Sequence, residues 1–126
     1  MTALTTESRG LLVTALTGHG FKVYGTAPAI PVTPSVVIVP DAPWITPERI
    51  GGRLNYRVRW KLLVVINPRK NDAASVDTEN AIDVVLGLMP SGFTVDQVGP
   101  PSLTDLGAQG TVITTEINVQ AHMKES

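Results

Sequence analysis

The fold is decided by one stretch of the sequence, RLNYRVRWKLLVVIN, which runs from Arg53 to Asn67. Apolar and polar residues alternate in its first part, from Arg53 to Lys61. A period of two over this length predicts a long strand with one apolar face, because successive side chains in a strand point to opposite sides. From Leu62 to Ile66 the stretch is continuously apolar, which predicts that the strand enters a region covered on both faces.

A helix is expected on each side of this strand in the chain. The first is predicted over about Thr6–Thr17, where apolar residues recur at helical spacing and Gly18 and Gly20 supply a stop. The second is predicted over about Ala73–Met89. The predicted buried stripe of the first helix is Leu4, Leu11, Leu12, Ala15 and Leu16. The predicted stripe of the second is Ala74, Val76, Ala81, Val84, Val85 and Leu88.

Shorter strands complete the expected fold. They are predicted at Phe21–Tyr24, Ser35–Val39, Phe93–Val98, Ser102–Leu106 and Thr111–Ala121. The proline-rich segment Pro40–Gly52, PDAPWITPERIGG, is expected to be a loop, with Gly51-Gly52 as a hairpin hinge. This order predicts an α+β fold, a mixed β-sheet with both helices packed on one face. A chain of 126 residues suits one domain, residues 1–126, of which we expect residues 122–126 to be a flexible tail.

Composition excludes several classes of function. With no cysteine, the chain has neither a disulfide framework nor a thiolate metal site. A formal net charge of −1 argues against broad binding of nucleic acid, which usually needs a strongly basic surface. The longest apolar runs fall far short of the roughly 20 residues that span a bilayer, and the first residues lack the pattern of a signal peptide. We therefore expect no membrane contact.

The chemistry-bearing residues form no recognisable catalytic or metal-binding pattern. His19 lies between two glycines and His122 lies near the end of the sequence, neither with a second ligand at metal-binding spacing. Asp77, Glu79 and Asp83 are expected on the solvated face of the second helix. The serines have no histidine in a recognisable nucleophile–base pattern. We therefore expect no enzyme activity, no metal and no cofactor.

Two features are candidates for an interaction surface. Arg53, Arg57, Arg59 and Lys61 place four cations on one face of the long strand. They are interpreted either as a stripe that faces DNA or an acidic neighbouring subunit, or as a solvated face paired across strands with acids such as Glu116. Trp44 is the second candidate. A tryptophan in a proline-rich loop either covers the edge of the core or is offered to a partner.

The order and pattern of the segments resemble a known family of phage proteins. The segments that carry the likeness are Pro34–Ile45 (PSVVIVPDAPWI), Tyr56–Ile66, Asn67–Ala74 (NPRKNDAA), Gly92–Pro101 (GFTVDQVGPP) and Gly110–Val119 (GTVITTEINV). Over nearly the whole chain the sequence is similar to the small tail terminator proteins of long-tailed bacteriophages that infect actinobacteria. These proteins are related in fold to the tail terminator of phage lambda.

The resemblance implies a structural virion protein. Members of this family form a hexameric ring that caps the completed tail tube, stops its polymerisation and joins it to the head connector. The implied partners are further copies of the chain, the major tail tube protein, the head–tail connector protein and the DNA that passes through the lumen. The implied location is the tail or neck of the virion, after assembly in the host cytoplasm.

Two alternatives stay open at this point. Another neck ring protein, of the stopper or adaptor type, would share the size and the α+β layout. A small ligand-binding module would gather polar and aromatic residues around one pocket, and the chain has only two Trp, two Tyr and two Phe with which to do so.

Overall fold

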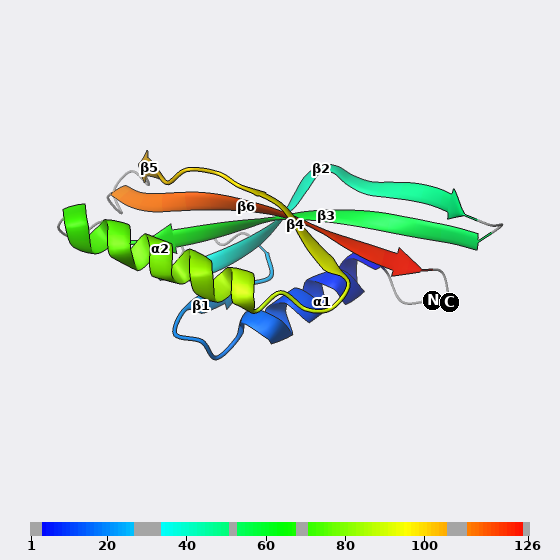
Figure 1. Ribbon diagram of the computed structural model, residues 1–126, viewed down its shortest axis with the longest axis horizontal. Coiled ribbons are helices and arrows are strands. Elements are labelled where there is room, and N and C mark those ends of the chain that lie inside the picture. The colour runs from blue at the N-terminus through cyan, green and yellow to red at the C-terminus, as the bar shows by residue number, and fades with distance from the viewer. Residues whose placement is uncertain (1–3, 27–33, 51–52, 68–70, 106–110, 125–126) are drawn as a thin grey trace.

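The part of the chain that the structure describes folds into one mixed sheet of six strands with two helices on one of its faces (Figure 1). The structure is a computed structural model and describes residues 4–26, 34–50, 53–67, 71–105 and 111–124. In chain order the elements are α1 (Leu4–Leu16), β1 (Lys22–Tyr24), β2 (Ser35–Ile50), β3 (Arg53–Ile66), α2 (Asn71–Gly87), β4 (Phe93–Val98), β5 (Ser102–Asp105) and β6 (Thr111–Lys124). This confirms the predicted α+β class.

The two longest antiparallel pairings lie at the centre of the sheet. The strand order is β1-β2-β3-β6-β4, and β5 also pairs with β6. Only β1 and β2 pair in parallel among the described strands. β4 and β5 follow one another along β6, and between them the Gly99 N–H donates to the Glu116 carbonyl at 2.8 Å. β6 runs to Lys124, so residues 122–124 are strand rather than tail, and residues 125–126 lie outside the described residues.

The prediction of a loop over residues 40–52 is wrong, because β2 continues to Ile50 and pairs with β3 along most of its length. Ile50 pairs with Arg53. The predicted hairpin hinge, Gly51-Gly52, lies outside the described residues. A bulge between Pro40 and Ile45 interrupts the register and contains the cis peptide bond Ala42–Pro43. Prolines are tolerated here because β1 pairs only with residues 35–37 of β2, so from Pro40 onward one side of β2 has no described neighbouring strand.

The main core lies between the helices and the sheet. Val58, Trp60 and Leu62 of β3 are fully buried on the helix side, as the alternation predicts. From α1, Leu12 and Leu16 pack onto them, whereas Leu11, predicted to be buried, is 42% exposed. Val13, which the prediction left out, also packs against the core, and the side chain of the predicted Leu4 lies outside the described residues.

The buried stripe of α2 differs in phase from the prediction. Val76 and Val84, predicted to be buried, are 52% and 41% exposed, whereas Val85 is buried as predicted and Thr78, which the prediction left out, is buried as well. Ile82 also packs against the core. Thr78, Ile82 and Val85 are three or four residues apart, so they share one helix face. The predicted Ala81, Val85 and Leu88 belong to this cluster, and the side chain of Ala74 lies outside the described residues.

A second cluster covers one end of the opposite sheet face. Val37, Val65 and Val112 are buried there, with Tyr24 and Leu63 packed beside them. Val64, Val65 and Ile66 are consecutive and all buried. This confirms that the long strand ends in a region covered on both faces. At the other end, β2 and β3 extend past both helices (Figure 1). No described helix is long and apolar enough to cross a membrane.

Candidate interaction surface

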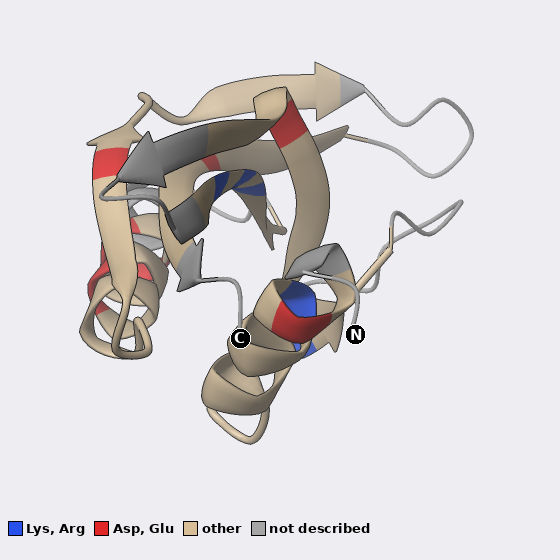
Figure 2. Ribbon diagram, turned by 90° about the vertical axis from the view of Figure 1, so that its right-hand side faces the viewer, with Lys and Arg blue, Asp and Glu red and all other residues tan. Residues whose placement is uncertain are grey.

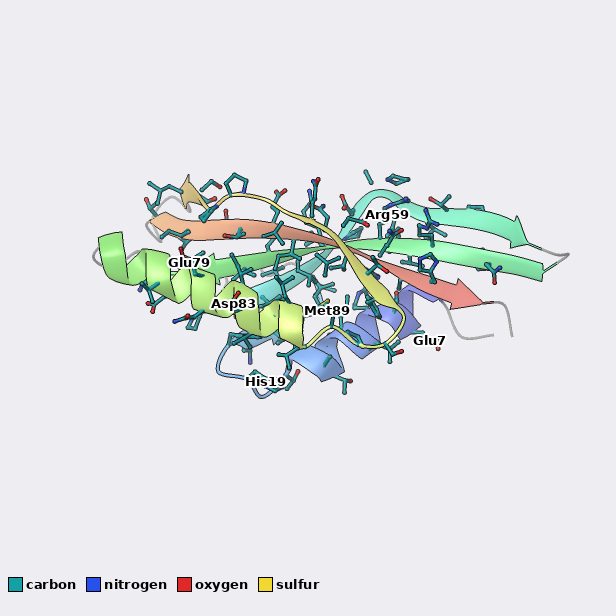
Figure 3. The ribbon with its side chains drawn as sticks, in the orientation of Figure 1. Glu7, His19, Arg59, Glu79, Asp83 and Met89 are labelled. Atoms are coloured by element: carbon teal, nitrogen blue, oxygen red, sulfur yellow. The ribbon has the colours of Figure 1, made fainter. Side chains whose placement is uncertain are left out.

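The cation row of β3 lies on the sheet face that carries neither described helix. Alternation turns Val58 and Trp60 towards the helices, so Arg57, Arg59 and Lys61 point the other way. Figure 3 shows Arg59 on the side of the sheet opposite the helices. Arg53 begins β3 opposite Ile50, and its side chain lies outside the described residues. The structure thus places the three described members of the predicted row on one face.

Each described cation of the row lies against a neighbouring strand. Arg59 Nη1 donates to Thr46 Oγ1 on β2 at 2.9 Å. Lys61 Nζ lies 3.9 Å from Glu116 Oε2 on β6, which confirms the predicted cross-strand contact with that acid. Arg57 is half-buried and stands opposite His122. Half-burial and these contacts leave the row less exposed than a freely solvated stripe would be.

Carboxylates from neighbouring strands lie on the same face. Asp41 Oδ2 accepts a hydrogen bond of 2.6 Å from Asn118 Nδ2, across the width of β3. Asp96 Oδ1 accepts one of 2.7 Å from Gln120 Nε2. Gln97 Nε2 donates to Asn118 Oδ1 at 3.3 Å. The face is therefore a mixed polar network rather than a positive stripe, which favours protein contact over a DNA-facing surface.

Trp44 both covers the edge of the core and stays partly exposed, so each of the two interpretations holds in part. It lies in the bulge of β2, next to the cis proline Pro43. Its ring meets that of Trp60 edge to face, with centroids 5.6 Å apart and planes at 81°. It is nevertheless 36% exposed, and Ile45 beside it is 40% exposed. One side of the indole closes the core and the remainder is open to a partner, as in aromatic anchors of interfaces.

Trp60 contacts both Trp44 and α1. Its Nε1–H donates to Ser8 Oγ on α1 at 2.8 Å, with both residues fully buried. The Arg9 guanidinium lies 5.0 Å from the Trp60 ring centroid, a cation–π distance. The alternation predicts Trp60 as a core residue, but nothing in the sequence pairs it with Ser8 and Arg9, about 50 residues away.

A cleft of about 390 Å³ opens beside α2. Its polar lining comes from His19, Asn67, Asp77 and Asn80, and its apolar lining includes Phe21 and Val84. His19 is exposed, as predicted, and projects from the connection after α1 (Figure 3). Across the described residues, no group of three or more His, Asp or Glu side chains could hold a metal ion. One histidine and one carboxylate are too few to specify a reaction.

Neither a protein-family model nor a curated protein sequence matches the chain. The candidate surface is therefore defined by its own residues. They fall on opposite faces of the sheet: the network around Arg59 and Lys61 lies on the face without helices, and the exposed sides of Trp44 and Ile45 lie on the helix side, next to Trp60 and Val58.

Proposed function

We propose that this chain is a structural subunit of a ring in the neck of a long-tailed bacteriophage, of the tail terminator type. The observation that carries the proposal is the extension of β2 and β3 beyond both helices (Figure 1). β6 follows β3 as far as Asn55, so most of this arm is a three-stranded sheet with no described helix beneath it, and it gains from contact with another surface. Exposed Trp44 and Ile45 lie at the base of this arm, against Trp60 and opposite Val58, and supply apolar area that such a contact would bury.

The subunit offers different surfaces that a head-to-tail contact in a ring could use. Its arm, its helix layer and its polar sheet face are different surfaces, and a head-to-tail contact between different surfaces closes into a ring when the rotation per subunit divides a full turn. The resemblance to tail terminators supplies the expected number of copies, six. It also supplies the partners: the tail tube protein on one side and the head–tail connector on the other.

Mass measurement and microscopy test this function together. Light scattering over a range of concentrations should show assembly toward six copies, and electron microscopy should show rings at the ends of tubes made from the cognate tail tube protein. A chain that stays monomeric at high concentration and leaves the tubes uncapped would contradict the proposal. A ring that binds connector but not tubes would instead favour a stopper or adaptor protein.

The polar sheet face has its own test in this role. Arg57→Glu with Arg59→Glu should reduce the joining of tails to heads, measured as the yield of complete particles, because the reversed charges would repel an acidic partner. Lys22→Glu, on an exposed position of β1, is the matched control. A normal yield from the double variant, with its fold intact by circular dichroism, would remove this face from the docking surface.

A second function, binding of a small molecule, is favoured by the cleft beside α2. Its volume of about 390 Å³ falls within the usual range for ligand sites. A ligand found by thermal-shift screening should lose its effect in Asn80→Trp, because an indole at this exposed lining position would occupy the mouth. Unchanged ligand binding by that variant, or no stabilising compound at all, would contradict this second function.

A further inference from the structure

The cleft beside α2 is lined by one carboxylate and, among the described residues, by no Lys or Arg. Its polar lining consists of the Asp77 carboxylate, the His19 imidazole and the side-chain amides of Asn67 and Asn80. The helix that forms one wall carries acidic residues and no basic ones along its length (Figure 2). The lining therefore favours a positively charged ligand over a carboxylate or a phosphate.

The Asp77 carboxylate is half-buried, and no hydrogen bond or ion pair engages it within the described part of the chain. Lys22 is close to the cleft in sequence, but it does not line it. Its neighbour Val23 packs into the main core, so alternation along β1 turns Lys22 to the other face of the sheet. Partial burial weakens the hydration of a carboxylate, so Asp77 would gain from a cationic group brought by a ligand.

Apolar side chains lie beside this carboxylate. Asp77, Ala81 and Val84 are three or four residues apart on α2, so they share one side of the helix. Phe21, before β1, and Ile66, at the end of β3, complete the apolar lining with Pro34. A ligand in the cleft would thus meet an acidic group and an apolar surface together.

We propose that the cleft binds an organic ammonium group carried on a short apolar body, such as an arylalkyl amine. This inference rests on the second function proposed above, binding of a small molecule, and names the class of ligand. A primary ammonium has three N–H donors, and Asp77, Asn67 and Asn80 supply carboxylate and amide oxygens as acceptors. Phe21 and Val84 offer apolar surface to the body, and the face of an aromatic ring also attracts a cation. A bare metal ion would gain nothing from this apolar part of the lining.

Three probes of similar shape test the class of ligand. At neutral pH phenethylamine is positively charged, phenethyl alcohol is neutral and hydrocinnamate is negatively charged. The amine should bind at least about fivefold more tightly than the alcohol, because a hydrogen bond to a charged group is stronger than one between neutral groups, and the anion should bind most weakly. The affinities are measured by titrations that follow the NMR signals of residues 19–21, 66–67 and 77–84, around the cleft. Added salt should reduce the advantage of the amine and have little effect on the alcohol.

Two single variants of α2 test the role of the carboxylate. Asp77→Asn keeps the shape of the side chain and removes its charge, so it should weaken the binding of phenethylamine at least about fivefold and leave that of phenethyl alcohol nearly unchanged. Glu79→Gln is the matched control. It removes one negative charge from the same helix at an exposed position two residues away, which does not face Asp77. This control should bind all three probes like the wild type.

The outcomes separate the class of ligand from the function on which it rests. If the three probes bind equally, or if Asp77→Asn keeps the preference for the amine, the ammonium class is wrong and small-molecule binding stands. If the amine binds only after Arg69→Gln with Lys70→Gln, cations of the chain itself compete for the cleft, and the proposal fails. If no probe and no compound from the thermal-shift screen affects the cleft, the class of ligand and the second function fail together.

Discussion

Trp60 donates a buried hydrogen bond of 2.8 Å from its Nε1–H to the Ser8 hydroxyl, which ties α1 to the central strand of the sheet. Removing the hydroxyl by Ser8→Ala leaves a buried donor without that acceptor. We expect a loss of about 1–3 kcal/mol in the free energy of unfolding, measured by urea denaturation. Ser102→Ala, at an exposed hydroxyl, should change it by less than about 0.5 kcal/mol.

A double-mutant cycle makes the origin of this loss explicit. Combining Ser8→Ala with Trp60→Phe removes donor and acceptor together, so the two losses should not add, and a coupling of about 0.5–3 kcal/mol should remain. Strict additivity would mean that the hydrogen bond contributes nothing to stability.

Two glycines should respond to alanine with opposite signs. Gly92 has a φ of +90°, a conformation that a Cβ disfavours, so Gly92→Ala should destabilise the fold by about 1 kcal/mol. Gly87 lies in the last turn of α2, and a Cβ there meets nothing within 4 Å. Gly87→Ala should stabilise by up to about 1 kcal/mol, because alanine favours helix. Thermal unfolding compares them directly, and shifts of the same sign would contradict the prediction.

The buried hydroxyl of Thr115 should be dispensable. Thr115 is 1% exposed, and its Oγ1 has no hydrogen-bond partner among the described residues. Thr115→Val replaces the hydroxyl with a methyl group of similar size, so stability should stay the same or rise by about 1 kcal/mol. At Thr114 the same change removes a 2.8 Å contact with the Thr104 hydroxyl and should lower stability. A loss at Thr115 larger than that at Thr114 would show that its hydroxyl is engaged.

The edge-to-face contact of Trp44 predicts a graded response. Trp44→Ala removes the ring that closes over Trp60 and should cost about 1–2 kcal/mol of stability, whereas Trp44→Phe keeps an aromatic edge and should cost less. If Trp44 also meets a neighbouring copy, both variants should weaken self-association by more than their effect on unfolding. Equal stability of the Ala and Phe variants would contradict the stacking contribution.

The elements that could be predicted from the sequence are those marked by a regular apolar pattern within one segment. The alternation around Val58 and Trp60 fixes both the strand and its buried face, and the apolar run up to Ile66 indicates its doubly covered end. The failure at residues 40–52 has a local cause as well. Prolines and a bulge with a cis bond break the alternation, although the backbone stays extended on an edge that needs fewer donors.

Other misses arose where several apolar residues competed for one face. On α2 the buried face includes Ile82 and the polar residue Thr78, which the prediction left out, and excludes the predicted Val76 and Val84. The candidate surface shows the same limit. The face of the cation row followed from period two, but Thr46, which accepts from Arg59, lies on another strand, and only the register of that strand brings the two together.

The uneven covering of the sheet gives the subunit the mechanics of a cantilever. At one end, the cluster around Val64 covers the helix face of the central strands and the cluster around Val65 covers the opposite face. The far end projects without a helix beneath it. Bending should therefore concentrate in the projecting end, because segments with few buried contacts deform at the lowest free energy. A rigid root with a compliant tip would let identical subunits share one core geometry while each tip adjusts to the angle at which its neighbour arrives.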